Sequence, residues 1–273
     1  HVIRGEEWLP STPKHVLLYR AFDWDLPIYV HLPLLLNKDR SKLSKRQNDV
    51  AVRDYLSKGY QPDALINFMS LLGWNPGDDR EILNLDELIE EFSLEKINKS
   101  GAIFDLDKLN WFSQQYYQKM SPEEFYDIAR DWLSKSDEKI VHQFNKHVAL
   151  ACQTRISNLS EIKEEFSHIF SSIKYNSKDL IFKKSDKEKT LKGLEEILKD
   201  IENIAENSWN VDNLQLHLAS IVRKYNLSNG DVFWPVRYAL SGKERSETPV
   251  ELLMELGKEK SISRIKKGIS YLK

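Results

Sequence analysis

Helix-start signals recur along most of this chain of 273 residues. Asn84 with Glu87 forms a capping pair before LDELIEEF. Residues 248–251 (TPVE) form a further capping box, and the helix that it begins is predicted to end at Gly257. Pro62 begins the apolar segment PDALINFMSLLG, which stops at a glycine. From about residue 48 onward the sequence therefore predicts helices almost throughout, and no repeat of solenoid length is evident.

The first 50 residues have the pattern of an α/β fold. HVIR at the start and IYVHLPLLL further on are apolar, β-branched strand candidates; the second is expected to be buried, and Pro33 makes it short or an edge strand. Between them, Ser11-Thr12-Pro13 begins a predicted helix, with Ser11 as the capping residue. The order strand, helix, strand predicts that the two strands are parallel.

The second half is predicted to be all helix. Apolar residues from Leu191 to Ile201 fall at three- and four-residue steps, which indicates an amphipathic face. The lysine-rich stretch 172–189 has the weakest ordering signal and is predicted to connect two helical bundles. The final segment is basic and includes Arg264, Lys266 and Lys267. A solvated helix face is one interpretation of this segment.

Composition limits the class of protein. The hydrophobic content of 41% supports real cores, and the net charge of −2 excludes a uniformly basic nucleic-acid coat but not a local basic face. The single Cys152 excludes a disulfide framework and a cysteine-based zinc site, and it fits a reducing, cytosolic compartment. No apolar run approaches the length of a membrane span, and no signal peptide is visible. Because His1 lies inside a predicted strand, we expect a fragment of a longer protein.

The histidines do not form a metal-site pattern. His15 and His31 are lone residues on apolar elements, where structural roles are expected. His142 and His147 are five residues apart on a predicted helix, which is poor ligand geometry. No Ser/His/Asp or Cys/His arrangement stands out, and no glycine-rich phosphate loop is present.

A basic loop, KLSKR at residues 42–46, follows the second predicted strand. A triphosphate that loses pyrophosphate develops charge on its β and γ oxygens, and the ammonium groups of Lys42 and Lys45 can follow that charge into the transition state. Open α/β sheets place their ligands at such strand exits. On chemistry alone, a solvated lysine-rich turn is the favoured interpretation of the stretch.

The flanking blocks decide between these interpretations. RGEEWLPSTPKH, HLPLLLNKDRSKLSKR, FDLDKLNW and FWPVRYALSGKERSETPVELLMELGKEKSISRI occur in this order, and together they resemble the class I aminoacyl-tRNA synthetases. More narrowly, the chain resembles the bacterial-type glutamate–tRNA ligases over essentially its whole length. The glutaminyl relatives carry β-barrels after the catalytic part, where this chain is predicted to be helical.

The resemblance implies a mostly α fold. Its parts are the C-terminal remnant of a Rossmann-type α/β catalytic domain (1–47), a helical stem-contact domain (48–120), and an all-α anticodon-binding region of two bundles (121–172 and 173–273). It also implies ATP-dependent activation of L-glutamate to glutamyl-adenylate and transfer to the 3′ end of tRNA(Glu), with ATP and Mg²⁺ as cofactors, no zinc, and a cytoplasmic monomer with no membrane contact.

Site residues are implied one by one. Lys42, Ser44 and Lys45 would act on the departing pyrophosphate, with both lysines also binding ATP. Glu7 and Trp8 match positions near the ribose and adenine. The backbone of Leu34 and Leu35 would meet the adenine edge, with their side chains in the core.

Arg4 would bind the carboxylate of the glutamate substrate in a bidentate fork; the alternative is a salt-bridge partner at the end of a strand. Arg155, with Thr154 and Asn158, would face the anticodon, and the alternative for Arg155 is a helix-end arginine bonded to a carbonyl group. The basic final segment would contact RNA backbone, and a solvated helix face is the equal alternative.

One family signature is missing. The His-x-Gly-His element is absent, and Gly5 is the only glycine in the first 50 residues. We therefore expect no glutamyl-adenylate formation by this chain alone. Asn48, after the loop, replaces the family's usual glycine and tolerates the left-handed conformation that glycine would supply. A freestanding, non-catalytic helical tRNA-binding or interaction protein with a degenerate loop is the alternative. The presence of both KLSKR and RGEEW favours the ligase.

Overall fold

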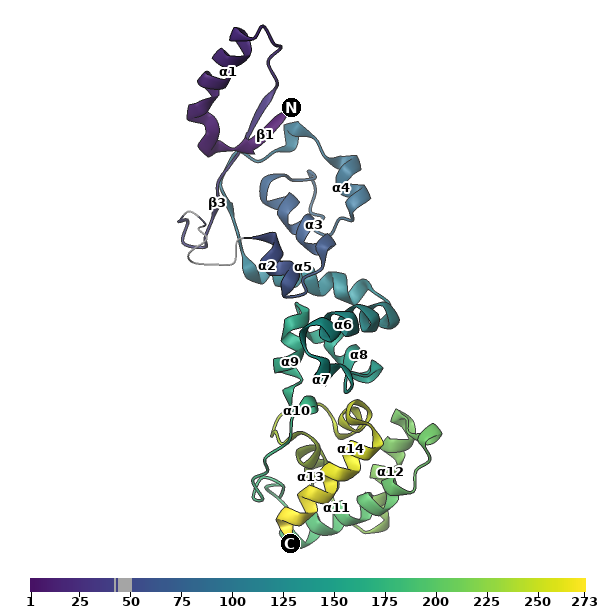
Figure 1. Ribbon diagram of the computed structural model, residues 1–273. Helices are drawn as coiled ribbons and strands as arrows, with labels where there is room; N and C mark the ends of the chain where they lie inside the picture. Colours follow the sequence, from purple (N-terminus) through teal and green to yellow (C-terminus); the bar gives the residue numbers. More distant parts are fainter. Residues whose placement is uncertain (42, 44–50) are drawn as a thin grey trace. The chain divides into compact units, whose positions relative to one another are not determined.

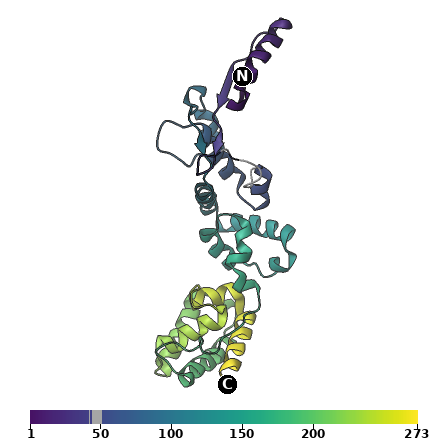
Figure 2. The same cartoon turned by 90° about the vertical axis from the view of Figure 1, so that its left-hand side faces the viewer.

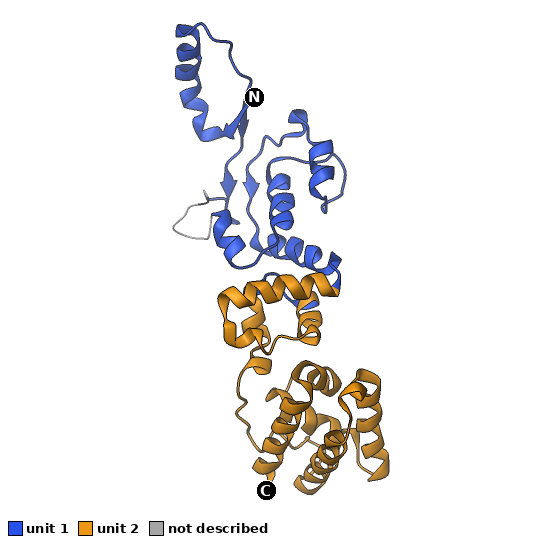
Figure 3. Ribbon diagram, turned by 45° about the vertical axis from the view of Figure 1, so that its right-hand side comes forward, with its two compact units in different colours: residues 1–121, 154–160 blue, residues 122–153, 161–273 orange. Residues whose placement is uncertain are grey.

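The computed structural model describes residues 1–41, 43 and 51–273, so residues 42 and 44–50 lie outside the description. Within the described chain there are fourteen α-helices and four short strands, which confirms the predicted mostly-α fold (Figure 1). The described residues divide into two compact units, 1–121 with 154–160 and 122–153 with 161–273 (Figure 3). The finer division into four domains stays a prediction.

The first unit begins with a parallel strand pair. Strand β1 (Val2–Gly5) pairs with β2 (Tyr29–Leu32), and the 3₁₀-helix η1 (Glu6–Ser11) and helix α1 (Thr12–Ala21) connect them. The predicted parallel arrangement is therefore confirmed. Every residue of β2 is only partly buried, so the expectation of a buried strand was wrong.

Pro33 ends β2, and the chain then forms β3 (Leu35–Leu36). This strand pairs in parallel with β4 (Ala102–Ile103), far along the sequence. A proline has no N–H to donate to a ladder, which explains why the apolar run is split into two strands.

Helix α1 starts at the predicted place, with Thr12 followed by Pro13, but the predicted side-chain cap was wrong. Ser11 has helical backbone angles, φ −87° and ψ −13°, and its side chain makes no capping hydrogen bond. The reason is that η1 runs directly into α1, so Ser11 is already inside a helical turn instead of in the extended conformation that a side-chain cap requires.

The helices of the first unit are α2 (Val52–Ser57), α3 (Pro62–Gly73), α4 (Leu85–Glu91) and α5 (Leu106–Lys119), with a short η2 (Leu94–Lys96). The Asn84 capping box is confirmed: its side chain accepts from the Glu87 N–H at 2.9 Å, and Glu87 accepts from the Asn84 N–H at 2.7 Å. The main core of this unit comprises Tyr55, Tyr60, Ala64, Leu65, Phe68, Leu109 and Phe112.

Gly59 closes the contact between α2 and residues 154–160. Its φ of +81° favours glycine, and an added Cβ would lie 2.6 Å from the Leu159 Cβ. The Lys58 carbonyl accepts from the Ser160 N–H at 3.0 Å, and the Tyr117 hydroxyl donates to the Gly59 carbonyl. The turn after α2 is therefore tied to a segment a hundred residues further on.

The second unit is all helix. It contains α6 (Pro122–Ser136), α7 (Glu138–Val141), most of α8 (Lys146–Arg155), α9 (Ile162–Glu165) and α10 (Ser167–Phe170). A short η3 (Leu159–Glu161) lies before α9, and its first two residues belong to the first unit. The long helices α11 (Lys187–Glu202), α12 (Val211–Lys224), α13 (Asn229–Ser241) and α14 (Pro249–Leu272) then pack on one another, with a short η4 (Glu206–Ser208) before α12 (Figure 2).

Three sequence predictions for this unit have clear outcomes. His142 follows α7 and His147 lies in α8, so the prediction that they share one helix was wrong. Gly257, with φ 72° and ψ 171°, interrupts α14 where a helix end was predicted. The connection before α11 is irregular as predicted, yet Tyr175 within it is buried and donates to the Ala239 carbonyl at 2.6 Å, so the connection is packed.

Candidate functional site

Arg4 lies at the centre of a polar cluster that three elements build. Its Nε donates to Nε2 of His31 at 3.2 Å, one terminal nitrogen lies 3.0 Å from Nδ1 of His15, and the other donates to the Thr12 hydroxyl at 2.8 Å. The Tyr29 ring covers the guanidinium plane at 4.9 Å. Arg4 and His31 are direct partners in the β1–β2 register, which explains why their side chains meet.

The charge of Arg4 has no carboxylate partner among the described residues. A guanidinium group only donates, so each ring nitrogen that faces it accepts and carries no proton. The sequence alternative of a salt-bridge role for Arg4 therefore has no support in the part of the chain that is described. Sequence reasoning assigned His15 and His31 structural roles and missed that both contact Arg4.

Glu7 and Trp8 lie in η1, next to the arginine cluster. Both side chains are exposed, and Trp8 keeps 50% of its surface, so plain packing does not account for the indole. The Leu34 N–H donates to Oε1 of Glu6 at 3.3 Å, which places η1 beside the segment that contains Leu35.

The side chain of Leu35 was expected in the core, and this expectation was wrong. It is 39% exposed, and Leu34 is only partly buried. The Leu35 carbonyl accepts from the Leu43 N–H at 3.1 Å, so the end of β3 is joined to the start of the basic loop. The predicted loop residues Lys42, Ser44, Lys45 and Arg46, with Asn48 after them, lie outside the described residues.

The predicted anticodon residues differ in accessibility. Thr154 and Arg155 are exposed at the C-terminal end of α8, and the Thr154 carbonyl accepts from Nε2 of Gln114 at 3.1 Å. Asn158 is only 5% exposed, and its Oδ1 accepts from the Ser160 hydroxyl at 2.5 Å. The structure therefore corrects the expectation for Asn158: its side chain faces the protein and does not offer a surface for a base edge.

Arg264, in the basic C-terminal segment, lies neither on an RNA surface nor on a solvated helix face. Arg264 is buried and donates to the carbonyl groups of Leu240, Ile169 and Ser171. Burial lowers the pKa of Arg264 to about 10. Lys266 pairs with Glu202 at 2.7 Å, and Lys267 donates to the Ile173 carbonyl at 2.8 Å. These cations hold backbone and helices of their own unit.

Lys260, also on α14, has the same role as Arg264. Lys260 donates to the Ile169 carbonyl and to Oε1 of Gln143, both at 2.5 Å. Burial, and then the positive charge of Arg264, lower the pKa of Lys260 to about 8. The C-terminal end of α10 is thus held by two side chains of α14 at once.

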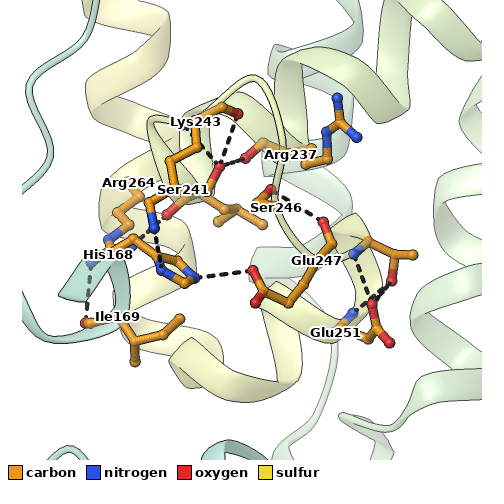
Figure 4. A network of polar contacts seen from close by, with 11 residues as sticks. His168, Ile169, Arg237, Ser241, Lys243, Ser246, Glu247, Glu251 and Arg264 are labelled. Carbon is orange, nitrogen blue, oxygen red and sulfur yellow. Dashed lines mark hydrogen bonds and ion pairs between the residues drawn. The ribbon is translucent and has the colours of Figure 1, made fainter. Parts of the chain in front are cut away.

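A buried polar network lies beside this contact (Figure 4). Ligand atoms of His168, Glu247 and Glu255 lie within 4.8 Å of one another, and a nitrogen with two carboxylates suits a divalent metal. However, Nζ of Lys243 lies 3.3 Å from Nδ1 of His168. Because a lysine ammonium only donates, Nδ1 accepts and Nε2 carries the ring proton, which opposes a metal at Nε2. No motif in the sequence indicated this network.

The comparisons with known proteins follow the two halves of the chain. Residues 1–111 match the family model for the catalytic domain of class I tRNA synthetases (E and Q), and residues 124–269 match the family model for an anticodon binding domain. The chain belongs to the anticodon binding domain family, whose model matches more than half of its residues. The catalytic-domain model matches the segment that contains RGEEWLPSTPKH, the block that indicates the E and Q branch.

Known proteins are similar to this chain over its whole length. It is 42% identical over 279 residues to a glutamate–tRNA ligase of Clostridium botulinum (strain Eklund 17B) and 40% identical over 278 residues to one of Clostridium novyi (strain NT). The chain covers 56% and 57% of those proteins, so it spans little more than half their length.

A solved structure gives the same result. The present chain matches the crystal structure of a glutamate tRNA ligase from Elizabethkingia meningosepticum, in complex with its amino acid, with a TM-score of 0.79 and 33% sequence identity. The match covers all of this chain and 57% of that protein. None of the helices among the described residues is long and apolar enough to cross a membrane.

Proposed function

We propose that this chain is part of a glutamate–tRNA ligase. The α-carboxylate oxygen of L-glutamate attacks the α-phosphorus of ATP, the bond to the β-phosphate oxygen breaks, and pyrophosphate leaves. A 3′-terminal ribose hydroxyl of tRNA(Glu) then attacks the glutamyl carbonyl, AMP leaves, and the hydroxyl proton is released. The match to the class I catalytic-domain model and the relatives' names support this reaction.

The observation that carries the proposal is Arg4. Its guanidinium is held by neutral acceptors and has no carboxylate partner among the described residues, so its charge is available to an anionic substrate. After these bonds each terminal nitrogen keeps a second N–H, which is the number that a bidentate carboxylate requires. We assign Arg4 to the side-chain carboxylate of glutamate.

The nucleotide is assigned to the neighbouring surface. The exposed Glu7 carboxylate can accept from the ribose hydroxyls, and the exposed Trp8 indole offers a face to the adenine. Lys42, Ser44 and Lys45 would stabilise the departing pyrophosphate, with Mg²⁺ on the ATP. Thr154 and Arg155 would contact the anticodon. We expect a cytoplasmic monomer.

The test uses the full-length gene product with ATP, L-glutamate and a transcript of tRNA(Glu). Formation of glutamyl-tRNA is the expected result. Lys45→Ala should lower the rate by about 100-fold or more, because one charge-stabilising group is lost from the transition state, while tRNA affinity stays within about twofold. Tight tRNA binding without glutamyl-tRNA would contradict the proposal and favour the non-catalytic tRNA-binding alternative.

A further inference from the structure

We propose that His15 and His31 are positioning residues for substrate recognition, a role that rests on the proposed function of Arg4. They hold the guanidinium with lone pairs instead of negative charges. Arg4 is thereby fixed in one orientation while its full charge remains for the substrate. This role differs from the structural roles expected of two lone histidines.

The geometry of the cluster fixes the plane of the guanidinium. His31 accepts from Nε at 3.2 Å on one edge, and His15 and Thr12 receive the two terminal nitrogens at 3.0 and 2.8 Å. The Tyr29 ring covers one face, 4.9 Å from Cζ. A guanidinium held at all three nitrogens and one face cannot rotate, so its remaining N–H groups point in fixed directions.

Thr12 links Arg4 and His31 to η1. Its hydroxyl accepts from Arg4, lies 3.4 Å from Nε2 of His31, and lies 3.4 Å from the carbonyl oxygen of Trp8, to which it donates. The arginine cluster is therefore joined to η1, the element that also presents Glu7 and Trp8. An ordered Arg4 and an ordered η1 depend on the same hydroxyl.

The choice of histidine over a carboxylate has a physical reason. Asp or Glu at either position would hold arginine more strongly, but it would neutralise the charge that attracts the substrate. A neutral imidazole accepts one hydrogen bond and leaves the charge unbalanced. Strand register supports the arrangement, because Arg4 and His31 are direct partners in the β1–β2 pair.

The experiment measures the KM for L-glutamate and the KM for ATP in tRNA(Glu) aminoacylation by the full-length gene product. His15→Ala and His31→Ala should each raise the glutamate KM by about tenfold, the value of one lost hydrogen bond to a charged group, and leave the ATP KM within about twofold. His15→Asn keeps an acceptor near Nδ1, and His31→Gln keeps one near Nε2. Both should restore the glutamate KM to within about threefold of the original.

A charged variant separates positioning from folding. His31→Glu retains an acceptor and adds an ion pair with Arg4, so the melting temperature should hold or rise while the glutamate KM increases by about tenfold or more. His142→Ala, an exposed histidine after α7, is the control and should change neither value.

The outcomes are distinguishable. If Arg4→Ala leaves the glutamate KM unchanged, the proposed glutamate site itself is wrong. If Arg4→Ala raises it and the two histidine-to-alanine variants do not, only the positioning role is overturned. Asn and Gln variants that restore the melting temperature without restoring the glutamate KM would also overturn it. If an alanine variant does not fold, His31→Gln against His31→Glu decides.

Discussion

Nε2 of His168 lies 3.1 Å from Oε2 of Glu247, and the two side chains are 4% and 7% exposed. His168 belongs to α10, and Glu247 immediately precedes the capping residue of α14. Lys243 faces the other ring nitrogen (Figure 4). The pair therefore joins two segments eighty residues apart through a buried, fully polar contact.

Removing the histidine should destabilise the second unit. His168→Ala leaves the Glu247 carboxylate buried without its imidazole, so the free energy of unfolding should fall by about 3 kcal/mol. Glu247→Gln keeps a polar side chain of nearly the same volume and removes only the charge, so it should lose about 1 kcal/mol. Urea unfolding followed by circular dichroism measures both. The exposed His142→Ala is the matched control, expected within about 0.5 kcal/mol of the original. Equal losses for His168→Ala and the control would contradict this account.

Arg264 offers a second stability test. Arg264→Met removes the donor from three backbone carbonyls, so about 3 kcal/mol of unfolding free energy should be lost. Lys266→Met, which breaks one exposed ion pair, should cost under about 1 kcal/mol. Affinity for tRNA(Glu), measured on the folded fraction, should be the same for both variants. A stable Arg264→Met protein with weakened tRNA binding would contradict this account and assign Arg264 to an RNA-binding surface.

Lys260 predicts a pH dependence of stability. Its pKa is about 8 in the folded chain and has a reference value of 10.5, so between these pH values the unfolded chain binds more protons. The free energy of unfolding of the original protein therefore rises with pH across this window, relative to that of the Lys260→Met variant. The side chain is only partly buried, so the gain is discounted to about 1 kcal/mol. Urea titrations of both proteins at pH 7.5 and 10 give the difference, and a constant difference would contradict the prediction.

Local signals in the sequence predicted local structure well. The Asn84 capping box and the start of α3 at Pro62 depend only on neighbours within one helical turn, so they are found where the residues stand. The parallel β1–β2 pair followed from element order alone. The predicted capping role of Ser11 was wrong because a side-chain cap depends on the conformation of the preceding turn, which no single residue determines.

The polar contacts could not be predicted in the same way. The meeting of Arg4 and His31 depends on strand register, which the spacing of two short apolar runs does not fix. Arg264 had a usable signal that was overlooked. It shares the buried face of α14 with Ile265 and Gly268, so a cation on that face must be paired inside the unit. Counting basic residues in the segment obscured this periodicity.

Arg155 gives the sharpest test of the RNA surface. Arg155→Ala removes an exposed guanidinium at the end of α8, so affinity for tRNA(Glu) should fall by about tenfold because a contact with an anticodon base edge is lost. Lys119→Ala, an equal change of charge at an exposed site of α5, should change affinity by less than about threefold. Fluorescence anisotropy with the chain itself and labelled tRNA measures both. A tRNA with a substituted anticodon should bind the original chain as weakly as tRNA(Glu) binds Arg155→Ala. Equal effects of the two variants would show that Arg155 contributes only general charge.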